Sequence, residues 1–396
     1  MSQTSKLQFL SILPLLLNLL VLLAVIWIVV PAPAYNIWLF SVVASEWSLW
    51  FGALALIGII FSLFNRDGNL WLVSLTIGSI AFIISLYPLL SVVSEAREQN
   101  VSLSLKRYFK GLWKENNSSK NDAKNFTTYT FAQVDGKDLR LDVYLPTQNT
   151  ANNGASLIVV HGGAWSAGVR NDFPHWNQMF AAQGFTVFDI DYRLAQPNYL
   201  TATGDVKCAV KWVKENAEKF KVSPDRIALW GRSAGGHLAL LAAYSANDAR
   251  LPASCAETGA GENVRAVVSI YAPTDLPWAY DNPANGRVID GPQTLANFLG
   301  GSPHESVEMR ERYILASPVS HISANSPPTL LIHGGQDQLV RLENMNLLSD
   351  KLKEANMLHK TTFIPYAQHG FDYNLNGWGA QISEAAILNF LRENTR

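Results

Sequence analysis

The sequence predicts an α/β fold with a mostly parallel sheet, preceded by an apolar helical segment. From residue 126 onward, short apolar strands alternate with helical periods, which is typical of a sheet flanked by helices. The chain is 48% hydrophobic but only 16% charged. Residues 1–94 hold just four charges: Lys6, Glu46, Arg66 and Asp67. We therefore expect a three-helix transmembrane region over 1–94, a connector and linker over 95–125, and a catalytic domain over 126–396.

The composition also excludes several classes of protein. Lys and Arg total 31 against 32 Asp and Glu, so there is no basic excess of the kind that nucleic-acid binding needs. Two cysteines cannot build a disulfide-dense scaffold. The sequence holds no H-E-x-x-H motif, no paired C-x-x-C and no phosphate-binding loop, so no metal or cofactor is expected.

Three uncharged stretches, residues 7–30, 47–64 and 70–93, are long enough to cross about 30 Å of hydrocarbon as helices. A helix satisfies its own backbone hydrogen bonds in lipid, so three spanning helices are the simplest interpretation. The alternative for the first stretch is a signal peptide cleaved at 32–34. Its uncharged core exceeds the usual length of about 7–15 residues, which favours a membrane span.

The charges that flank the three stretches give opposing indications of the side of the membrane on which the catalytic domain lies. Lys6 and Arg66 favour a cytoplasmic N-terminus, which places the catalytic domain on the extracytoplasmic side. Arg97 and Lys106 follow the third stretch closely and argue for the opposite side. The extracytoplasmic side is the favoured prediction, and the oligomeric state is left open.

Residues 95–115 are expected to form an amphipathic helix. Five apolar residues recur along one helical face: Val101, Leu105, Tyr108, Phe109 and Leu112. Basic residues occupy the rest, as in a helix that lies in the headgroup region of a membrane. A helix packed on the soluble domain is an equal alternative. The polar residues 116–125 are expected to form a linker.

The expected strands are short apolar runs between turn signals. They lie at 127–134, 139–145, 156–160, 185–190, 227–230, 264–270, 329–333 and 360–364. The first two form an antiparallel hairpin. Helices are expected at 205–220, 237–244 and 382–391.

The central motif is the G-x-S-x-G of residues 231–235, in which a strand leads through Ser233 directly into a helix. This strand–turn–helix context is what a nucleophile elbow requires. The turn is so tight that a Cβ at Gly231 or Gly235 would collide with neighbouring backbone. The alternative is a serine that only caps the helix.

A serine hydroxyl needs a base to become a nucleophile. His369 lies in a loop after the last strand, and Asp337 directly follows strand 329–333, which gives the chain order Ser, Asp, His. His369 would accept the proton of Ser233, and Asp337 would orient the imidazole. The rival carboxylates, Asp275 and Glu343, lie off the strand end, and Asp275 is expected to cap a turn. Three other histidines are expected to be structural: His161, His237 and His333.

A tetrahedral oxyanion needs preorganised N–H donors. Gly162 and Gly163, just after strand 156–160, can offer their amides, together with the amide of Ala234 after the nucleophile. The alternative is a glycine turn with a purely structural role.

Four motifs together resemble the hormone-sensitive-lipase-like carboxylesterases, and most closely the BD-FAE-like branch that also includes prenylcysteine methylesterases. They are His161–Trp165, Asp191–Leu194, Gly231–His237 and His369–Phe371. The resemblance covers residues 126–396. It implies the α/β-hydrolase fold, a serine esterase with the triad Ser233, Asp337 and His369, and structural roles for Asp191 and Arg193. Ala164 departs from the pattern, since many relatives have a third glycine there.

The substrate pocket is expected to involve Trp165 and the segment 276–316, because pockets are mostly apolar. That segment holds four large aromatic residues: Trp278, Tyr280, Phe298 and Tyr313. The alternative is an aromatic loop packed on the domain.

These observations predict a membrane-anchored serine hydrolase that cleaves a small or lipid-like carboxylic ester through an acyl-enzyme. The alternatives are an acyltransferase or peptidase with the same triad, or a non-catalytic module that binds an apolar ligand. Cys208 and Cys255 could pair, which would place the domain in an oxidising compartment. Two unrelated buried thiols are slightly favoured over this pairing.

Overall fold

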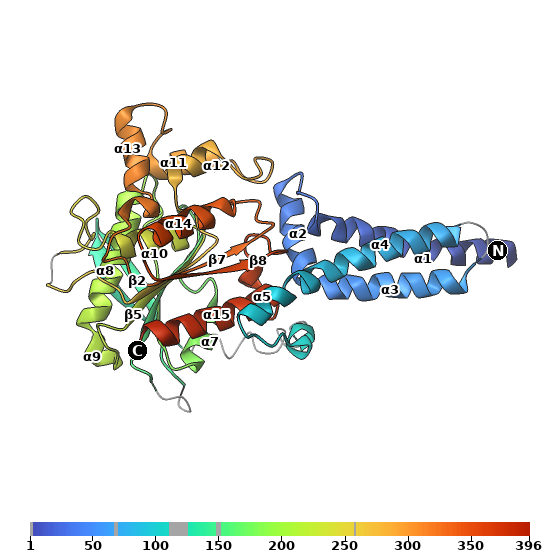
Figure 1. The fold of residues 1–396 in the computed structure, drawn as a ribbon, viewed down its shortest axis with the longest axis horizontal. Coiled ribbons are helices and arrows are strands. Elements are labelled where there is room, and N and C mark those ends of the chain that lie inside the picture. Colours follow the sequence, from blue (N-terminus) through green and yellow to red (C-terminus); the bar gives the residue numbers. More distant parts are fainter. Residues whose placement is uncertain (1–2, 67–69, 111–125, 148–151, 257–258) are drawn as a thin grey trace.

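The catalytic domain is built on one eight-stranded sheet (Figure 1). The computed structural model describes residues 3–66, 70–110, 126–147, 152–256 and 259–396. The strands are β1 (Thr127–Val134), β2 (Lys137–Tyr144), β3 (Ser156–Val160), β4 (Thr186–Ile190), β5 (Ile227–Arg232), β6 (Ala266–Ile270), β7 (Thr329–Gly334) and β8 (His359–Ile364). Their order in the sheet is β1-β2-β4-β3-β5-β6-β7-β8.

The sheet is parallel from β4 to β8, and the hairpin of β1 and β2 joins β4 in antiparallel fashion. Each expected strand is confirmed to within two residues at either end. Strands β3, β4 and β6 are buried along their whole length, as expected of parallel strands that helices cover on both faces.

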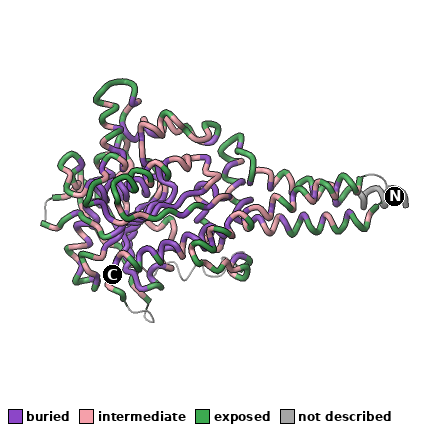
Figure 2. Tube along the Cα trace, viewed as in Figure 1, coloured by how far each residue is buried: buried purple, intermediate pink, exposed green. Residues whose placement is uncertain are grey.

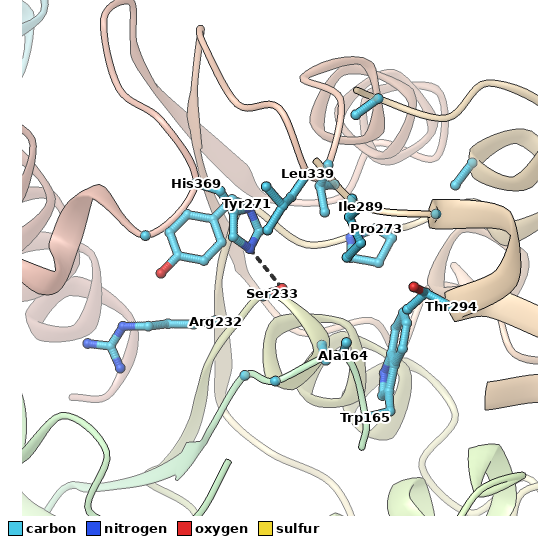
Figure 3. A pocket seen from close by; sticks show the side chains of 18 of the residues that line it. Ala164, Trp165, Arg232, Ser233, Tyr271, Pro273, Ile289, Thr294, Leu339 and His369 are labelled. Atoms are coloured by element: carbon cyan, nitrogen blue, oxygen red, sulfur yellow. Dashed lines mark hydrogen bonds between the residues drawn. The ribbon is translucent and has the colours of Figure 1, made fainter. Parts of the chain in front are cut away.

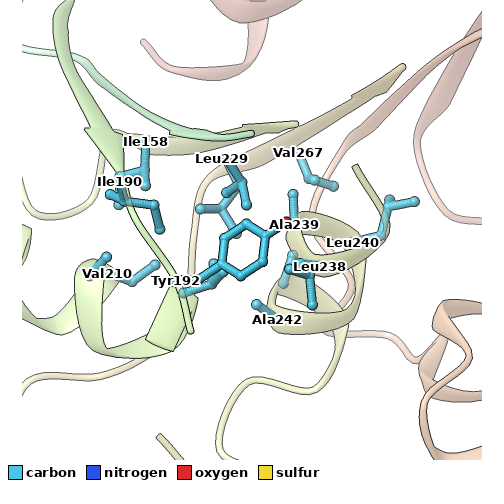
Figure 4. Close-up of a cluster of buried hydrophobic side chains, with 14 of the residues drawn as sticks. Ile158, Ile190, Tyr192, Val210, Leu229, Leu238, Ala239, Leu240, Ala242 and Val267 are labelled. Carbon is cyan, nitrogen blue, oxygen red and sulfur yellow. The ribbon is translucent and has the colours of Figure 1, made fainter. Parts of the chain in front are cut away.

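Helices cover both faces of the sheet. Alternate strand residues, such as Ile158, Leu229 and Val267, point to one face and pack against the helices there (Figure 4). That face carries α8 (Tyr199–Glu215), α10 (Ala234–Tyr244) and α14 (Glu343–Glu354). The other face carries α7 (Pro174–Ala182) and α15 (Trp378–Asn394).

The segment between β6 and β7 holds three short helices. They are α11 (Leu276–Asp281), α12 (Gly291–Leu299) and α13 (Val307–Leu315). The expected helix 205–220 starts earlier, at Tyr199, and is broken at Asn216 before α9 (Ala217–Phe220). The described residues also form three short 3-10 helices: η1 (Ile26–Ile28), η2 (Pro318–His321) and η3 (Phe371–Tyr373).

The N-terminal helices form an elongated module that projects from the domain (Figure 1). They are α1 (Gln3–Val25), α2 (Tyr35–Glu46), α3 (Ser48–Phe64) and α4 (Leu70–Ser91). Helices α1, α3 and α4 pack side by side, and α2 crosses the end of this bundle that adjoins the domain.

By length and composition, one continuous helix in the described residues can cross a membrane, Leu70–Glu98. Helices α2 and α3 qualify only as a pair bent by 80°, and the described apolar part of the first helix, Ile12–Ile28, is shorter. The three predicted spans are therefore not confirmed. The chain bends at Trp47, so the second predicted span is a helix of 17 residues, α3.

The interior of the bundle combines buried polar and small residues with an apolar cluster that includes Val21 and Val25, and its exterior is apolar. Asn18 is fully buried and donates to the backbone and side-chain oxygens of Ser74, at 2.9 and 3.1 Å. Ser62 and Ser74 share a 2.7 Å hydrogen bond. Much of the outer surface of the bundle is exposed (Figure 2). Large apolar side chains lie there; Leu20 and Ile83 are each 66% exposed.

The connector departs from the expected amphipathic helix. α5 (Val93–Glu98) continues the last bundle helix, and the chain has no regular secondary structure over 101–104 before a helix resumes at 105–110. Val101 is therefore outside any helix, while Leu112 and the expected linker lie outside the described residues. Tyr108 is buried and its ring stacks on Trp378 at 4.3 Å. This part of the connector packs on the domain, which was the alternative interpretation.

Candidate active site

Ser233 occupies a strained turn between β5 and α10. Its backbone has φ 52° and ψ −124°, a conformation that side-chain-bearing residues seldom adopt. A Cβ added at Gly231 would lie 2.2 Å from the carbonyl oxygen of Gly235, and one at Gly235 would lie 2.2 Å from that of Val160. Both glycines are thus required by the close approach of backbone, as the motif predicted.

The structure joins Ser233, His369 and Asp337 in one hydrogen-bonded chain. His369 Nε2 lies 2.9 Å from Ser233 Oγ (Figure 3), and His369 Nδ1 lies 2.7 Å from Asp337 Oδ2. The other carboxylate oxygen of Asp337 accepts the amides of Leu339 and Val340 at 2.8 and 3.0 Å. Each of the three residues follows the carboxyl end of a strand, β5, β7 or β8, so the sheet brings them to one edge.

The electrostatics favour an ionised Asp337. Burial by itself would raise the pKa of this carboxyl, but His369 and His333 nearby lower it, and the net pKa lies well below its ordinary value. A carboxylate can only accept hydrogen bonds, so Nδ1 of His369 carries the proton. Nε2 is then free to accept the proton of Ser233.

A second network holds the ring of His369 from behind. The ring of Tyr271 lies 4.3 Å from that of His369, and the Tyr271 hydroxyl donates to Asp372 Oδ1 at 2.5 Å. Asp372 also accepts a hydrogen bond from Arg232, whose guanidinium stacks 3.9 Å from the ring of Trp230. No pattern in the sequence indicates this network, because its members are far apart in the chain.

The three predicted N–H donors border Ser233. Gly162 lies two residues after the end of β3, and a Cβ built on it would lie 3.5 Å from Ser233 Cβ. Gly163 has φ +112°, a backbone conformation that suits glycine. No hydrogen bond within the described residues uses the amides of Gly162 or Gly163 as donors. Ala234 is the first residue of α10, where helix amides lack an intrahelical acceptor.

A cavity of about 560 Å³ opens over Ser233. Trp165 lines it, as predicted, and its ring stacks on Phe298 at 4.3 Å. Much of the wall was not predicted by residue, including Phe173, Pro283 and Leu295. Tyr271, Ile289 and Leu339 also line it (Figure 3).

The prediction for Trp278 and Tyr280 is wrong, since both lie outside this cavity. The reason is the helical period of α11, which turns Ala279 toward the cavity and its two aromatic neighbours away from it. Phe298 and Tyr313 are fully buried and pack behind the wall instead. The segment 276–316 does line the cavity, but through smaller residues.

The other histidines are structural, as predicted. His237 is buried, accepts the indole N–H of Trp165 at 3.2 Å and bonds to the carbonyl of Ala316 at 2.8 Å. Burial lowers the pKa of His237 to about 4, so it is neutral at pH 7. His161 and His333 bond to backbone carbonyls at 2.7 and 3.0 Å.

The rival carboxylates do not approach His369. Asp275 caps α11 by accepting the amide of Trp278 at 3.1 Å, as predicted. Glu343 pairs with Arg341 at 2.6 Å. Within the described residues, no group of three or more His, Cys, Asp or Glu side chains is arranged to hold a metal ion.

Two predicted bracing features are present. Arg193 donates hydrogen bonds of 2.7 and 3.0 Å to the buried carboxylate of Asp205, and Asp191 forms an ion pair with Arg170.

Cys208 and Cys255 form a disulfide, with their Cα atoms 5.6 Å apart. The alternative of two unrelated thiols is therefore wrong.

The helical module reaches the site. The amide of Ala32 donates to Gln338 at 2.7 Å, and the carbonyl of Ala32 accepts from Asn285, also at 2.7 Å. Tyr35, the first residue of α2, lines the cavity over Ser233. Sequence patterns could not indicate this contact, because Ala32 and Gln338 are 306 positions apart.

Comparison with known proteins places the domain among esterases. "Esterase LipC" of Mycobacterium tuberculosis is 33% identical over 64% of this chain and 62% of its own. "Probable carboxylic ester hydrolase LipM" of the same organism is 31% identical over 65% and 59%. The chain thus spans about three fifths of the length of these relatives. The propionate-bound esterase Est2 of Thermogutta terrifontis is 25% identical with a TM-score of 0.55, over 69% of this chain and 95% of its own.

The relatives are named as esterases or carboxylic ester hydrolases, in line with the arrangement around Ser233. The structural neighbour shares the mostly parallel sheet flanked by helices, so the α/β-hydrolase fold is confirmed. The BD-FAE family model matches residues 141–352, which is more than half of the chain and holds both Ser233 and Asp337. The chain therefore belongs to the BD-FAE family.

Proposed function

We propose that this protein is a carboxylic-ester hydrolase that works through an acyl-enzyme on Ser233. One observation carries the proposal: the hydrogen-bonded chain from Asp337 through His369 to Ser233, at the floor of a mostly apolar cavity. The names of the mycobacterial relatives support the same class of substrate.

In the proposed reaction, His369 Nε2 takes the proton of Ser233 as Oγ attacks the acyl carbon. The amides of Gly162, Gly163 and Ala234 stabilise the oxyanion that forms. His369 then returns the proton to the alcohol oxygen, the C–O bond breaks, and the alcohol leaves. Water attacks the acyl-enzyme by the same route and releases the acid.

The experiment is hydrolysis of p-nitrophenyl butyrate together with labelling by a fluorophosphonate. Wild-type protein should do both, and Ser233→Ala should lose both, with a fall in kcat of about 10⁴ or more. A wild-type protein that reacts with no serine-directed phosphonate would contradict the proposal. Product analysis with an added alcohol separates hydrolysis from acyl transfer.

We also propose that the helical module anchors the enzyme in a membrane, through α1, α3 and α4. The polar contacts of Asn18, Ser62 and Ser74 lie inside the bundle while Leu20 and Ile83 face outward. A bundle in water would bury its large apolar side chains, whereas membrane bundles join their helices through small and polar residues. Retention of the full chain in the membrane pellet after alkaline carbonate extraction tests the anchor; release into the supernatant would contradict it.

For the catalytic domain we propose the extracytoplasmic side. The Cys208–Cys255 disulfide supports this, because such bonds persist in oxidising compartments. A membrane-impermeant fluorophosphonate should label Ser233 in intact cells. Labelling only after the cells are lysed would place the domain inside.

A further inference from the structure

Helix α2 differs from the other helices of the module in its direction and its surface. It is bent by 80° relative to α3. If α3 crosses the bilayer, α2 therefore runs close to the plane of the membrane surface. Of the five exposed residues of α2, Asn36 is polar and four are apolar: Tyr35, Leu39, Phe40 and Val43 are 51%, 44%, 38% and 44% exposed. A helix in this orientation with one apolar exposed face is typical of the membrane interface.

The inner face of α2 is attached to the catalytic domain beside the site. Trp38 is buried in a small apolar cluster with Val288 and Leu339. Just before α2, Ala32 bonds to Gln338 and Asn285, and Gln338 directly follows Asp337 in the chain. These contacts hold the start of α2 at the rim of the cavity.

Tyr35 and Ser233 line the same cavity. The catalytic domain contributes apolar residues to the wall of this cavity, among them Pro283, Ile289 and Leu339. The half-exposed ring of Tyr35 therefore belongs both to the cavity wall and to the apolar face of α2. A hydrocarbon chain that enters here passes from lipid onto an apolar protein surface without crossing water.

We infer that the helical module is part of the substrate site, and that the enzyme takes esters with a long hydrocarbon chain directly from the bilayer, past Tyr35. This inference rests on the proposed esterase function and names its class of substrate. Tyr35 acts as a specificity-determining residue, because it contacts the chain of the ester and not the reacting carbonyl.

The first test captures the chain in place. Full-length protein in phosphatidylcholine vesicles is treated with a dodecyl fluorophosphonate that carries a diazirine at the chain end. Ser233 Oγ forms a bond to phosphorus, the P–F bond breaks and fluoride leaves. Irradiation then joins the chain end to whatever it touches, and peptide mapping finds the position.

We expect cross-links within residues 31–43. If Ser233 is phosphonylated but cross-links map only to other cavity segments, such as 279–295, the inference is overturned and the esterase proposal survives. If Ser233 is not phosphonylated at all, the proposed function itself fails. The two failures are thus distinct.

The second test measures selectivity for chain length. Tyr35→Ala should lower kcat/KM for p-nitrophenyl laurate in vesicles about fivefold more than for soluble p-nitrophenyl acetate, since lost apolar contact with a chain changes discrimination to this degree. Leu39→Ala is the matched control, one helical turn along the same exposed face and outside the cavity wall. An equal change of the ratio in both variants, or no change in Tyr35→Ala, would overturn the role of Tyr35.

Discussion

The hydroxyl of Tyr366 donates a 2.9 Å hydrogen bond to Oε1 of Glu46, joining residues 320 positions apart. Glu46 ends α2 and is buried, and Tyr366 lies three residues before His369. The same hydroxyl accepts the amide of Gly379 at 2.9 Å. The helical module and the loop that carries His369 therefore share a buried polar contact.

Replacing Glu46 tests the strength of this contact. Glu46→Ala leaves the buried Tyr366 hydroxyl without its acceptor, which should lower the free energy of unfolding by about 1–3 kcal/mol. Glu46→Gln keeps an acceptor oxygen and serves as the control. Thermal unfolding of the full chain in detergent measures both variants; equal losses in the two would show that the hydrogen bond has no part in the effect.

Tyr271→Phe should weaken the support of His369. The variant keeps the ring against the imidazole but removes the donor to the buried carboxylate of Asp372, which keeps its hydrogen bond from Arg232. A lost hydrogen bond to a charged group should cost about 1.5–3 kcal/mol of stability. Denaturant unfolding measures the loss, and an unchanged midpoint would contradict this account.

Asp337→Asn should lower kcat by about 10⁴, because the amide no longer holds His369 in the tautomer that accepts the serine proton. The low pKa of Asp337 keeps it ionised throughout the working range. Glu343→Gln is the control, since that carboxylate pairs with Arg341 away from His369. A larger loss in Glu343→Gln than in Asp337→Asn would reverse the assignment.

Asp189 should give stability a characteristic dependence on pH. Burial raises the pKa of Asp189 to about 7, although the amide of Asn171 and the side chain of Asn177 donate to it. The unfolded chain releases this proton near pH 4, while the folded protein keeps it until about pH 7. The folded state then binds more protons, so the contribution of Asp189 is fully present below pH 4 and is lost as pH rises to 7.

Asp189→Asn should flatten this dependence. We expect its melting temperature, relative to wild type, to be higher at pH 8 than at pH 4.5. Calorimetry at the two pH values gives the measurement. A difference between the two proteins that stays constant with pH would show that Asp189 does not titrate in this range.

Several features could be predicted because their signals are local. A buried strand such as β3 is a short apolar run, and the elbow at Ser233 is a strand, a glycine turn and a helix in immediate succession. Asp337 and His369 could be chosen because each follows a strand of a parallel sheet, whose carboxyl ends meet at one edge.

The cavity wall could not be predicted in the same way. Which of Trp278, Ala279 and Tyr280 faces the site depends on the rotation of α11, and the packing of α12 and α13 around it sets that rotation. Aromatic character alone pointed to the wrong two residues. Likewise, the apolar stretches of the N-terminal region did not reveal the sharp bend between α2 and α3.

The sequence by itself determined the elements of this protein: the strands, the tight turn around Ser233 and the apolar character of the N-terminal helices. Periodicity, glycine geometry and charge act over a few residues, so they can be found in the chain alone. Only the tertiary structure decided that Cys208 pairs with Cys255, that Tyr271 supports His369, and that Tyr35 borders the cavity. Such contacts depend on how whole helices and sheets pack, and the free energy of that packing is shared among many side chains distant in sequence.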